Sequence, residues 1–269
     1  MEADCPLKRW NRGTYRCADG KEIICRQEAV KLDKISQRRL PVNGIQSVDK
    51  HLLVVVSGTV LKRDLTEVIR GGPAQTCTLP RTVTTVCKKA FKSTNIASVK
   101  LNDGLKTLED SCFSYSGIRR LVLSASVRKI SQYAFSECWY LQCADLRAAR
   151  GLRYLDDYAF SCCRNLKRVL LNEGLRTICP GCFTESGVQE IAFPRTLRRI
   201  EGGAFMHCKR LGQVCLADTA LESVGTSAFS FSGFESFIAP PSLGTIGQYA
   251  FSNCKSLKHV DLSGMQGGR

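Results

Sequence analysis

The chain has 269 residues, 43% of them apolar, and a formal net charge of +15. This is enough material for one large or two small domains. The longest apolar run, residues 52–56, is far shorter than the roughly 18 residues of a membrane-spanning helix. The first ten residues lack the apolar stretch of an export signal, and no N-glycosylation acceptor occurs. These features exclude a membrane span and favour an intracellular protein, or a cell-surface protein if a signal is missing from this sequence.

The first 72 residues carry hairpin signals and do not follow the pattern of the rest of the chain. "TYRCADGKEIICR" predicts a hairpin around Asp19-Gly20, and "LLVVVSGTVL" predicts a second around Ser57-Gly58. The later part of the chain is repetitive, and a repeat array needs a terminal cap with a polar outer face. We therefore predict that residues 1–72 form an irregular N-terminal capping segment with hairpins.

From residue 73 onward an Ala-Phe or Cys-Phe dipeptide recurs every 22 to 25 residues. The anchor phenylalanines are Phe91, Phe113, Phe135, Phe160, Phe183, Phe205, Phe229 and Phe251. Two apolar residues three apart precede each anchor, Cys, Ser or Thr follows three residues after it, and a strand-like apolar pattern comes next. A period of 20–29 residues with this pattern is typical of leucine-rich repeats. We predict an α/β solenoid over residues 73–269 of about eight units, with parallel strands on one face and short helices or 3₁₀ turns on the other.

The repeat also accounts for many of the 15 cysteines. In a long chain without an export signal, reduced thiols are the expected state. Cys179 and Cys182 form a C-x-x-C pair, but each stands in a repeat column, and we expect Cys182 to be buried. Of the adjacent Cys162 and Cys163, we expect only Cys163 to point inward. A redox pair or half of a metal site is the alternative for Cys179 and Cys182.

Several units resemble one known family in detail. "ISQYAFSECWYLQCADL" and "IGQYAFSNCKSLKHVDL" are similar to BspA-type leucine-rich repeats, and the resemblance covers about residues 74–262. It implies a solenoid that binds macromolecules, often as an adhesin at a microbial surface, and it brings no catalytic motif. Three units use a shorter version of the pattern, in which Gly117, Gly187 and Gly233 are expected to take up the turn.

Two rows of residues suggest binding surfaces. Five consecutive units place a cation directly after the first apolar residue of the pair, at Lys106, Arg128, Arg153, Arg176 and Arg198. Stacking predicts a stripe roughly 20 Å long. It is either a solvated face or a binding surface for an acidic partner, which could be an acidic protein surface, a sulfated glycan, nucleic acid or anionic lipid.

The second row is apolar and occupies an outward strand position, at Val122, Leu170, Ala192 and Ile238. An exposed apolar row rimmed by charge indicates a protein interface, although strand preference alone could place such residues there. The last strand lacks a recognisable cap, which leaves self-association through the C-terminal end open.

No catalytic or nucleotide-binding motif occurs, and the three histidines, His51, His207 and His259, have no catalytic partner fixed by the repeat. We therefore predict no enzyme activity, small-molecule substrate, cofactor or metal. The expected function is a non-enzymatic interaction scaffold that binds a protein partner on the strand face. Polyanion binding through the cationic column is the alternative.

Overall fold

The structure is a computed structural model that describes residues 75–79 and 82–265, together with six strands nearer the N-terminus. Those strands are β1 (Leu7–Trp10), β2 (Thr14–Cys17), β3 (Glu22–Ile24), β4 (Leu52–Val56), β5 (Thr59–Lys62) and β6 (Glu67–Arg70). Over all of these residues the chain forms strands and turns and no helix. It follows that none of the described segments is a helix able to cross a bilayer.

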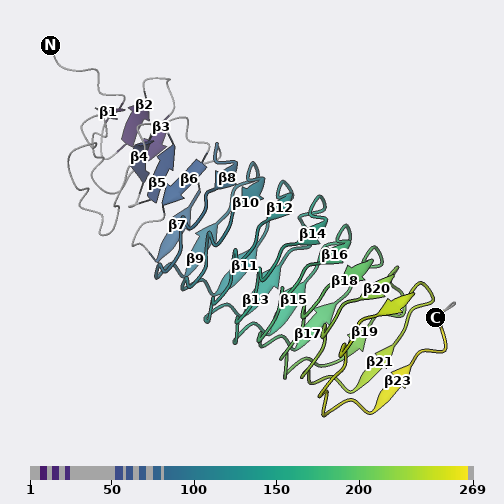
Figure 1. Ribbon diagram of the computed structural model, residues 1–269. Helices are drawn as coiled ribbons and strands as arrows, with labels where there is room; N and C mark the ends of the chain where they lie inside the picture. Colours follow the sequence, from purple (N-terminus) through teal and green to yellow (C-terminus); the bar gives the residue numbers. More distant parts are fainter. Residues whose placement is uncertain are drawn as a thin grey trace.

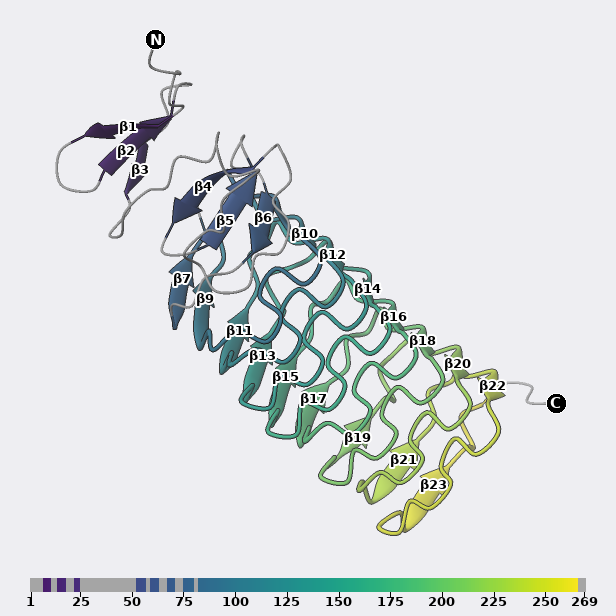
Figure 2. The same ribbon diagram turned by 60° about the vertical axis from the view of Figure 1, so that its left-hand side comes forward.

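From β7 onward the chain winds into stacked coils, and each coil supplies strands to two faces (Figures 1 and 2). One face, called here the strand face, consists of β7 (Thr76–Thr78), β9 (Ser98–Lys100), β11 (Arg120–Val122), β13 (Cys143–Asp145), β15 (Arg168–Leu170), β17 (Glu190–Ala192), β19 (Val214–Cys215), β21 (Ser236–Ile238) and β23 (His259–Asp261). The other, the short-strand face, consists of β8 (Thr85–Val86), β10 (Thr107–Leu108), β12 (Lys129–Ile130), β14 (Tyr154–Leu155), β16 (Thr177–Ile178), β18 (Arg199–Ile200), β20 (Ser223–Val224) and β22 (Thr245–Ile246). Strands of neighbouring coils pair in parallel, so the predicted parallel-strand solenoid is confirmed.

The N-terminal strands pair differently. β2 pairs antiparallel with β3, and β4 with β5, as the two hairpin signals predict. The turn residues of both hairpins lie outside the described part of the chain. β6 pairs antiparallel with β5 and parallel with β8, which joins β4, β5 and β6 to the short-strand face, whereas β1, β2 and β3 form a separate sheet. The capping role of residues 1–72 stays a prediction.

A single ladder of phenylalanine rings runs through the core. The anchors from Phe91 to Phe229 are at most 1% exposed, and Phe251 is half-buried. Adjacent rings lie nearly parallel, with centroids 4.8 to 5.9 Å apart. Aromatic rings in contact at these separations add to the stabilisation that burial provides. The recurring dipeptide is therefore the unit of packing between coils.

The prediction of a helix or 3₁₀ turn around each anchor is wrong. Residues two before and two after each anchor have positive φ, between 54° and 62°, as Tyr158 and Cys162 do around Phe160. A helix needs an unbroken run of negative φ, so these residues interrupt it. Alternate amides then bond within and between coils: Ser161 N donates to Tyr158 O at 3.1 Å, while Phe160 N donates to Cys182 O in the next coil at 2.8 Å. The hydrogen bonds between coils stabilise a backbone conformation that would otherwise be strained.

Strands also occur on two faces where one was expected. The apolar pair before each anchor, predicted only as an apolar motif, ends in a two-residue strand such as β16. Its backbone bonds to the coils on both sides, because Thr177 pairs with Tyr154 and with Arg199. Neighbouring coils are therefore bonded at the anchor turns, and along both faces except where one sheet ends and the next begins.

The Cys/Ser/Thr column has a hydrogen-bonding role. The thiol of each buried cysteine in this column donates to the carbonyl oxygen of the anchor Phe one coil earlier, at 3.0 Å in Cys138, Cys163 and Cys208. Ser232 donates to Phe205 O in the same way, at 2.6 Å. Cys163 is fully buried and Cys162 half-buried, which confirms the predicted inward residue. This repeat position therefore favours a small side chain that can donate one hydrogen bond.

Candidate binding surfaces

The strand face presents the predicted apolar row to solvent. Val122 is 50% exposed and Ile238 45% exposed, Ala192 is exposed and Leu170 is half-buried. Leu170 lies directly beside Ala192 in the parallel register, and Ile238 lies beside Cys215. Between Val122 and Leu170 the register inserts an acidic residue of β13, so Val122 stands apart. The apolar surface is thus concentrated between β15 and β21.

A hollow of about 490 Å³ lies within this apolar part of the strand face. Its lining includes Leu170, Ala192, Gly212 and Gln213. Gly212 supplies no side chain in a row where neighbouring coils carry Gln189 and Glu235, and its amide is held 3.1 Å from Gln189 O. This hollow was not predicted from the sequence. Gly212 could have indicated it, because a glycine in a strand-like pattern often marks a close approach of another backbone or a ligand.

Charge around the hollow is partly neutralised by pairs between coils. Arg168 Nε lies 2.7 Å from Glu190 Oε2, with both side chains more than half exposed, and Lys258 Nζ lies 3.3 Å from Glu235 Oε2. Exposed pairs of this kind contribute little to stability and are screened by salt. They place a polar rim beside the apolar row.

The predicted cationic column lies on the short-strand face, where all five cations are exposed. Each column residue directly precedes a short strand, and every column amide except that of Arg153 bonds to the residue at the same position one coil earlier. Arg176 N donates to Arg153 O at 2.7 Å and Arg198 N to Arg176 O at 2.8 Å, while Arg128 N donates to Lys106 O at 2.9 Å. The backbone ladder is interrupted between β12 and β14, where two separate sheets meet. The column is therefore two segments, Lys106 with Arg128 and then three arginines.

The five cations do not form the uniform stripe that the sequence predicted, because their side chains have different partners. Arg128 turns its guanidinium toward its own loop, where Nη1 donates to Ala125 O at 2.6 Å and to Val127 O at 3.1 Å. Its side chain passes over Gly151, at which an added Cβ would lie 2.2 Å from Arg128 Cδ. Packing over this glycine, which falls in the longer 25-residue unit, turns the charge away from the column.

Exposed aromatic residues gather along the anchor turns, another feature that the sequence analysis missed. The rings of Tyr133 and Tyr158 stack at 5.1 Å, and those of Tyr115 and Trp139 meet edge-on at 5.9 Å. Tyr115, Tyr133 and Tyr158 are among the positive-φ residues that lie two positions before or after an anchor. Aromatic residues at those two repeat positions were the available signal.

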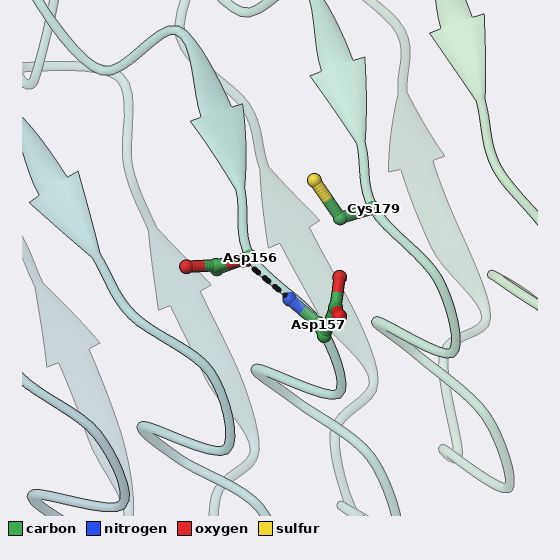
Figure 3. A group of neighbouring side chains, drawn as sticks. All are labelled: Asp156, Asp157 and Cys179. Atoms are coloured by element: carbon green, nitrogen blue, oxygen red, sulfur yellow. Dashed lines mark hydrogen bonds between the residues drawn. The ribbon is translucent and has the colours of Figure 1, made fainter.

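The C-x-x-C pair is divided between core and surface. Cys182 is fully buried, as predicted, and Cys179 is half-buried. Beside Cys179 lie Asp156 and Asp157 of the preceding coil, with ligand-type atoms of all three residues within 4.8 Å of one another (Figure 3). Asp157 N donates to Asp156 Oδ1 at 3.0 Å. Two carboxylates and a thiolate are ligand types that suit zinc, and the sequence analysis did not foresee their proximity.

Protonation opposes both metal binding and redox chemistry at these thiols. Burial, followed by the charges of Asp156 and Asp157, raises the pKa of the Cys179 thiol to about 12. Burial likewise raises the pKa of Cys182 well above its ordinary value, and burial together with Asp156 raises the pKa of the Asp157 carboxyl. The thiolate is the reactive and metal-binding form, so we expect burial to slow the reactions of both thiols in the folded protein.

Alkylation should reveal this order of reactivity. With iodoacetamide near pH 8, we expect exposed Cys215 to react first, half-buried Cys179 at least tenfold more slowly and Cys182 last, because burial limits access to the Cys179 and Cys182 thiols and raises their pKa. Mass spectrometry of the tryptic peptides over time gives the three rates, and unfolding in urea should make them similar. Fast modification of Cys179 in the folded protein would restore the redox interpretation.

Solved structures share the fold. A leucine-rich repeat protein from Eubacterium ventriosum is 22% identical with a TM-score of 0.62, over 69% of this chain and 51% of that one. A leucine-rich repeat protein from Bacteroides ovatus is 20% identical with a TM-score of 0.50, over 80% and 70% of the two chains. The chain thus spans about half the length of the Eubacterium ventriosum protein. No curated protein matches it.

The repeat itself has a known family model. The model for the BspA type leucine rich repeat region matches six copies, over residues 71–188 and 176–266. These ranges include every anchor phenylalanine of the core ladder, and they agree with the resemblance seen in the units around Phe135 and Phe251. The chain belongs to the BspA-type leucine-rich repeat family.

Proposed function

We propose that the chain is a non-enzymatic scaffold that binds a protein partner on its strand face. The observation that carries this proposal is the apolar row from Leu170 to Ile238, which spans four coils, or roughly 14 Å, and contains the hollow at Gly212. Membership of a family of repeat scaffolds supports the same function.

The surface has the composition of an interface. Protein interfaces combine an apolar centre, in which a few buried anchor residues supply most of the binding energy, with a polar rim. Here the apolar row forms the centre, and the Arg168–Glu190 pair lines the hollow together with Leu170 and Ala192 and supplies polar groups beside the row. The backbone under the row is held by parallel pairing of β15 with β17 and of β21 with β19 and β23, and the Gly212 N to Gln189 O bond joins the two sheets, so little ordering is needed on binding.

A variant that places charge in the row tests the proposal. Leu170→Asp together with Ile238→Asp should reduce capture of the partner at least tenfold, because unpaired carboxylates would be buried in the interface. The matched control, Thr226→Asp with Gln248→Asp, adds the same charge at exposed positions of the anchor turns. Quantitative mass spectrometry identifies the proteins that each variant retains from a lysate. Proteins that the control variant retains and the row variant loses are then purified, and their binding is measured by calorimetry.

Salt separates this mode of binding from polyanion binding. Apolar docking should change little between about 0.15 and 0.5 M salt, whereas binding that neutralises several anionic groups falls steeply. If the row variant retains every protein that the unmodified chain retains, the proposal is wrong.

A further inference from the structure

A second hollow, of about 310 Å³, lies on the short-strand face, away from the strand face. Its lining includes four arginines, Arg153, Arg176, Arg198 and Arg199, with Thr177 and Glu222. The four arginines come from three successive coils, at β18 or directly before β14, β16 and β18, and Glu222 lies directly before β20 in the next coil. Neighbouring parallel strands lie about 4.8 Å apart, so the backbones that carry these arginines lie close together and their side chains line one hollow.

These guanidinium groups are only partly neutralised. Arg198 pairs with Glu222, and Arg199 Nε lies 3.6 Å from Glu201 Oε1. Arg153 Nη1 donates to Gly174 O at 3.2 Å, which leaves its charge uncompensated. Within the described coils the Arg176 side chain has neither a hydrogen bond nor an ion pair, although it lies at the centre of the hollow's lining. Four cations thus face two carboxylates, and the excess charge lies at Arg153 and Arg176.

The donor geometry suits a compact anion. A guanidinium group presents a planar fork of N–H donors that matches the oxygens of phosphate or sulfate. The half-buried hydroxyl of Thr177 follows Arg176 directly, and Thr177 pairs with Tyr154 in the register of β14 and β16. Tyr154 is 40% exposed and also lines the hollow, so it offers a ring surface to the rest of a ligand.

The surroundings limit the site to one anionic group. Toward the N-terminus Arg128 is turned to the carbonyl oxygens of its own loop, and toward the C-terminus Glu222 ends the cationic column. A polymer such as nucleic acid gains its affinity by having many phosphates neutralised along a track, and such a track is interrupted here on both sides. We propose that the hollow binds a single tetrahedral oxyanion, carried as a phosphate or sulfate monoester, between Arg153 and Arg176 with Thr177 as a further donor.

Binding of two simple probes tests the proposal. Phenyl phosphate and phenyl sulfate are titrated by calorimetry at constant ionic strength, near pH 8. We expect at least one of them to show saturable binding, and the tighter of the two identifies which monoester the site prefers. Absence of saturable binding by both probes would overturn the proposal.

Matched variants separate a built site from net charge. Arg153→Gln with Arg176→Gln should weaken binding of the preferred probe at least tenfold. Arg119→Gln with Arg210→Gln removes the same charge at exposed positions that do not line the hollow, and should weaken it less than twofold. Arg176→Lys keeps the charge but loses the planar fork, so an intermediate loss is expected. Equal losses in the two double variants would mean a general charge effect and would overturn the proposal. The outcome is independent of docking on the strand face, because none of the lining residues lies there.

Discussion

Replacing Phe160 with alanine is expected to lower the free energy of unfolding by about 3–5 kcal/mol. The Phe160 ring is fully buried and stacks between the rings of Phe135 and Phe183, at centroid distances of 5.3 and 5.4 Å. Alanine would leave a cavity inside the ladder. Backbone hydrogen bonds at the strand face and at the anchor turns hold this coil to both of its neighbours, so the site cannot collapse to fill the cavity. Urea unfolding followed by circular dichroism measures the loss.

Two controls show whether the ladder itself is responsible. Phe251 is half-buried and is the last ring of the ladder, so Phe251→Ala should cost less than half as much as the Phe160 change. Tyr140 is 59% exposed, and its change to alanine should stay within about 0.5 kcal/mol. Equal losses at Phe160 and Phe251 would show that stacking on both sides adds nothing.

Replacing Gly187 with alanine should destabilise the protein by about 1–3 kcal/mol, a large effect for one methyl group. Gly187 belongs to one of the shortened units, and its amide donates to Cys163 O at 3.1 Å. An added Cβ would lie 2.1 Å from Arg164 O and 2.8 Å from Arg164 C. These are backbone atoms of the preceding coil, so the clash can be relieved only by separating the two coils. Thermal and urea unfolding measure the change.

The control for this prediction is Gly244→Ala. Gly244 is exposed, and the nearest atom to its added Cβ is Glu222 O at 3.7 Å, which is ordinary contact. Its change should stay within about 0.5 kcal/mol. A neutral Gly187→Ala would show that neighbouring coils can move apart freely. The sequence predicted that Gly187 takes up a turn. Among the described residues, however, the glycines with positive φ are Gly181 and Gly203, and Gly187 is not one of them. Gly187 is needed for close approach of two coils and not for a turn.

The inward residues of the repeat were predictable from the sequence. Phe160, Cys163 and Cys182 are fully buried as expected, and the strands after each anchor pair in parallel. The physical reason is that each coil packs against nearly identical coils, so a period along the chain becomes a period in space. Residue types that recur in one column are therefore exposed or buried together, as the outward Val122 and Ile238 also show.

The conformation of the anchor turn was not predictable in the same way. Local propensity allows a helical turn around Ala-Phe, and the choice against it depends on amides such as that of Phe160, which bonds to the next coil. Hydrogen bonds between coils exist only after stacking. These hydrogen bonds favour positive φ at residues such as Tyr158, a conformation that an isolated turn does not favour for non-glycine residues.

What the sequence by itself determined about this protein is the solenoid, its register and the columns that face solvent. The tertiary structure decided which outward residues can act together. It turns the Arg128 side chain away over Gly151 and leaves the Arg176 side chain without a hydrogen bond or ion pair in the described coils, and it opens a hollow at Gly212. It also places Asp156 beside Cys179. These differences arise from contacts between side chains of successive coils, which depend on side-chain torsions and on the size of the facing residue. The position of a residue in the repeat gives neither its side-chain torsions nor the size of the residue that faces it.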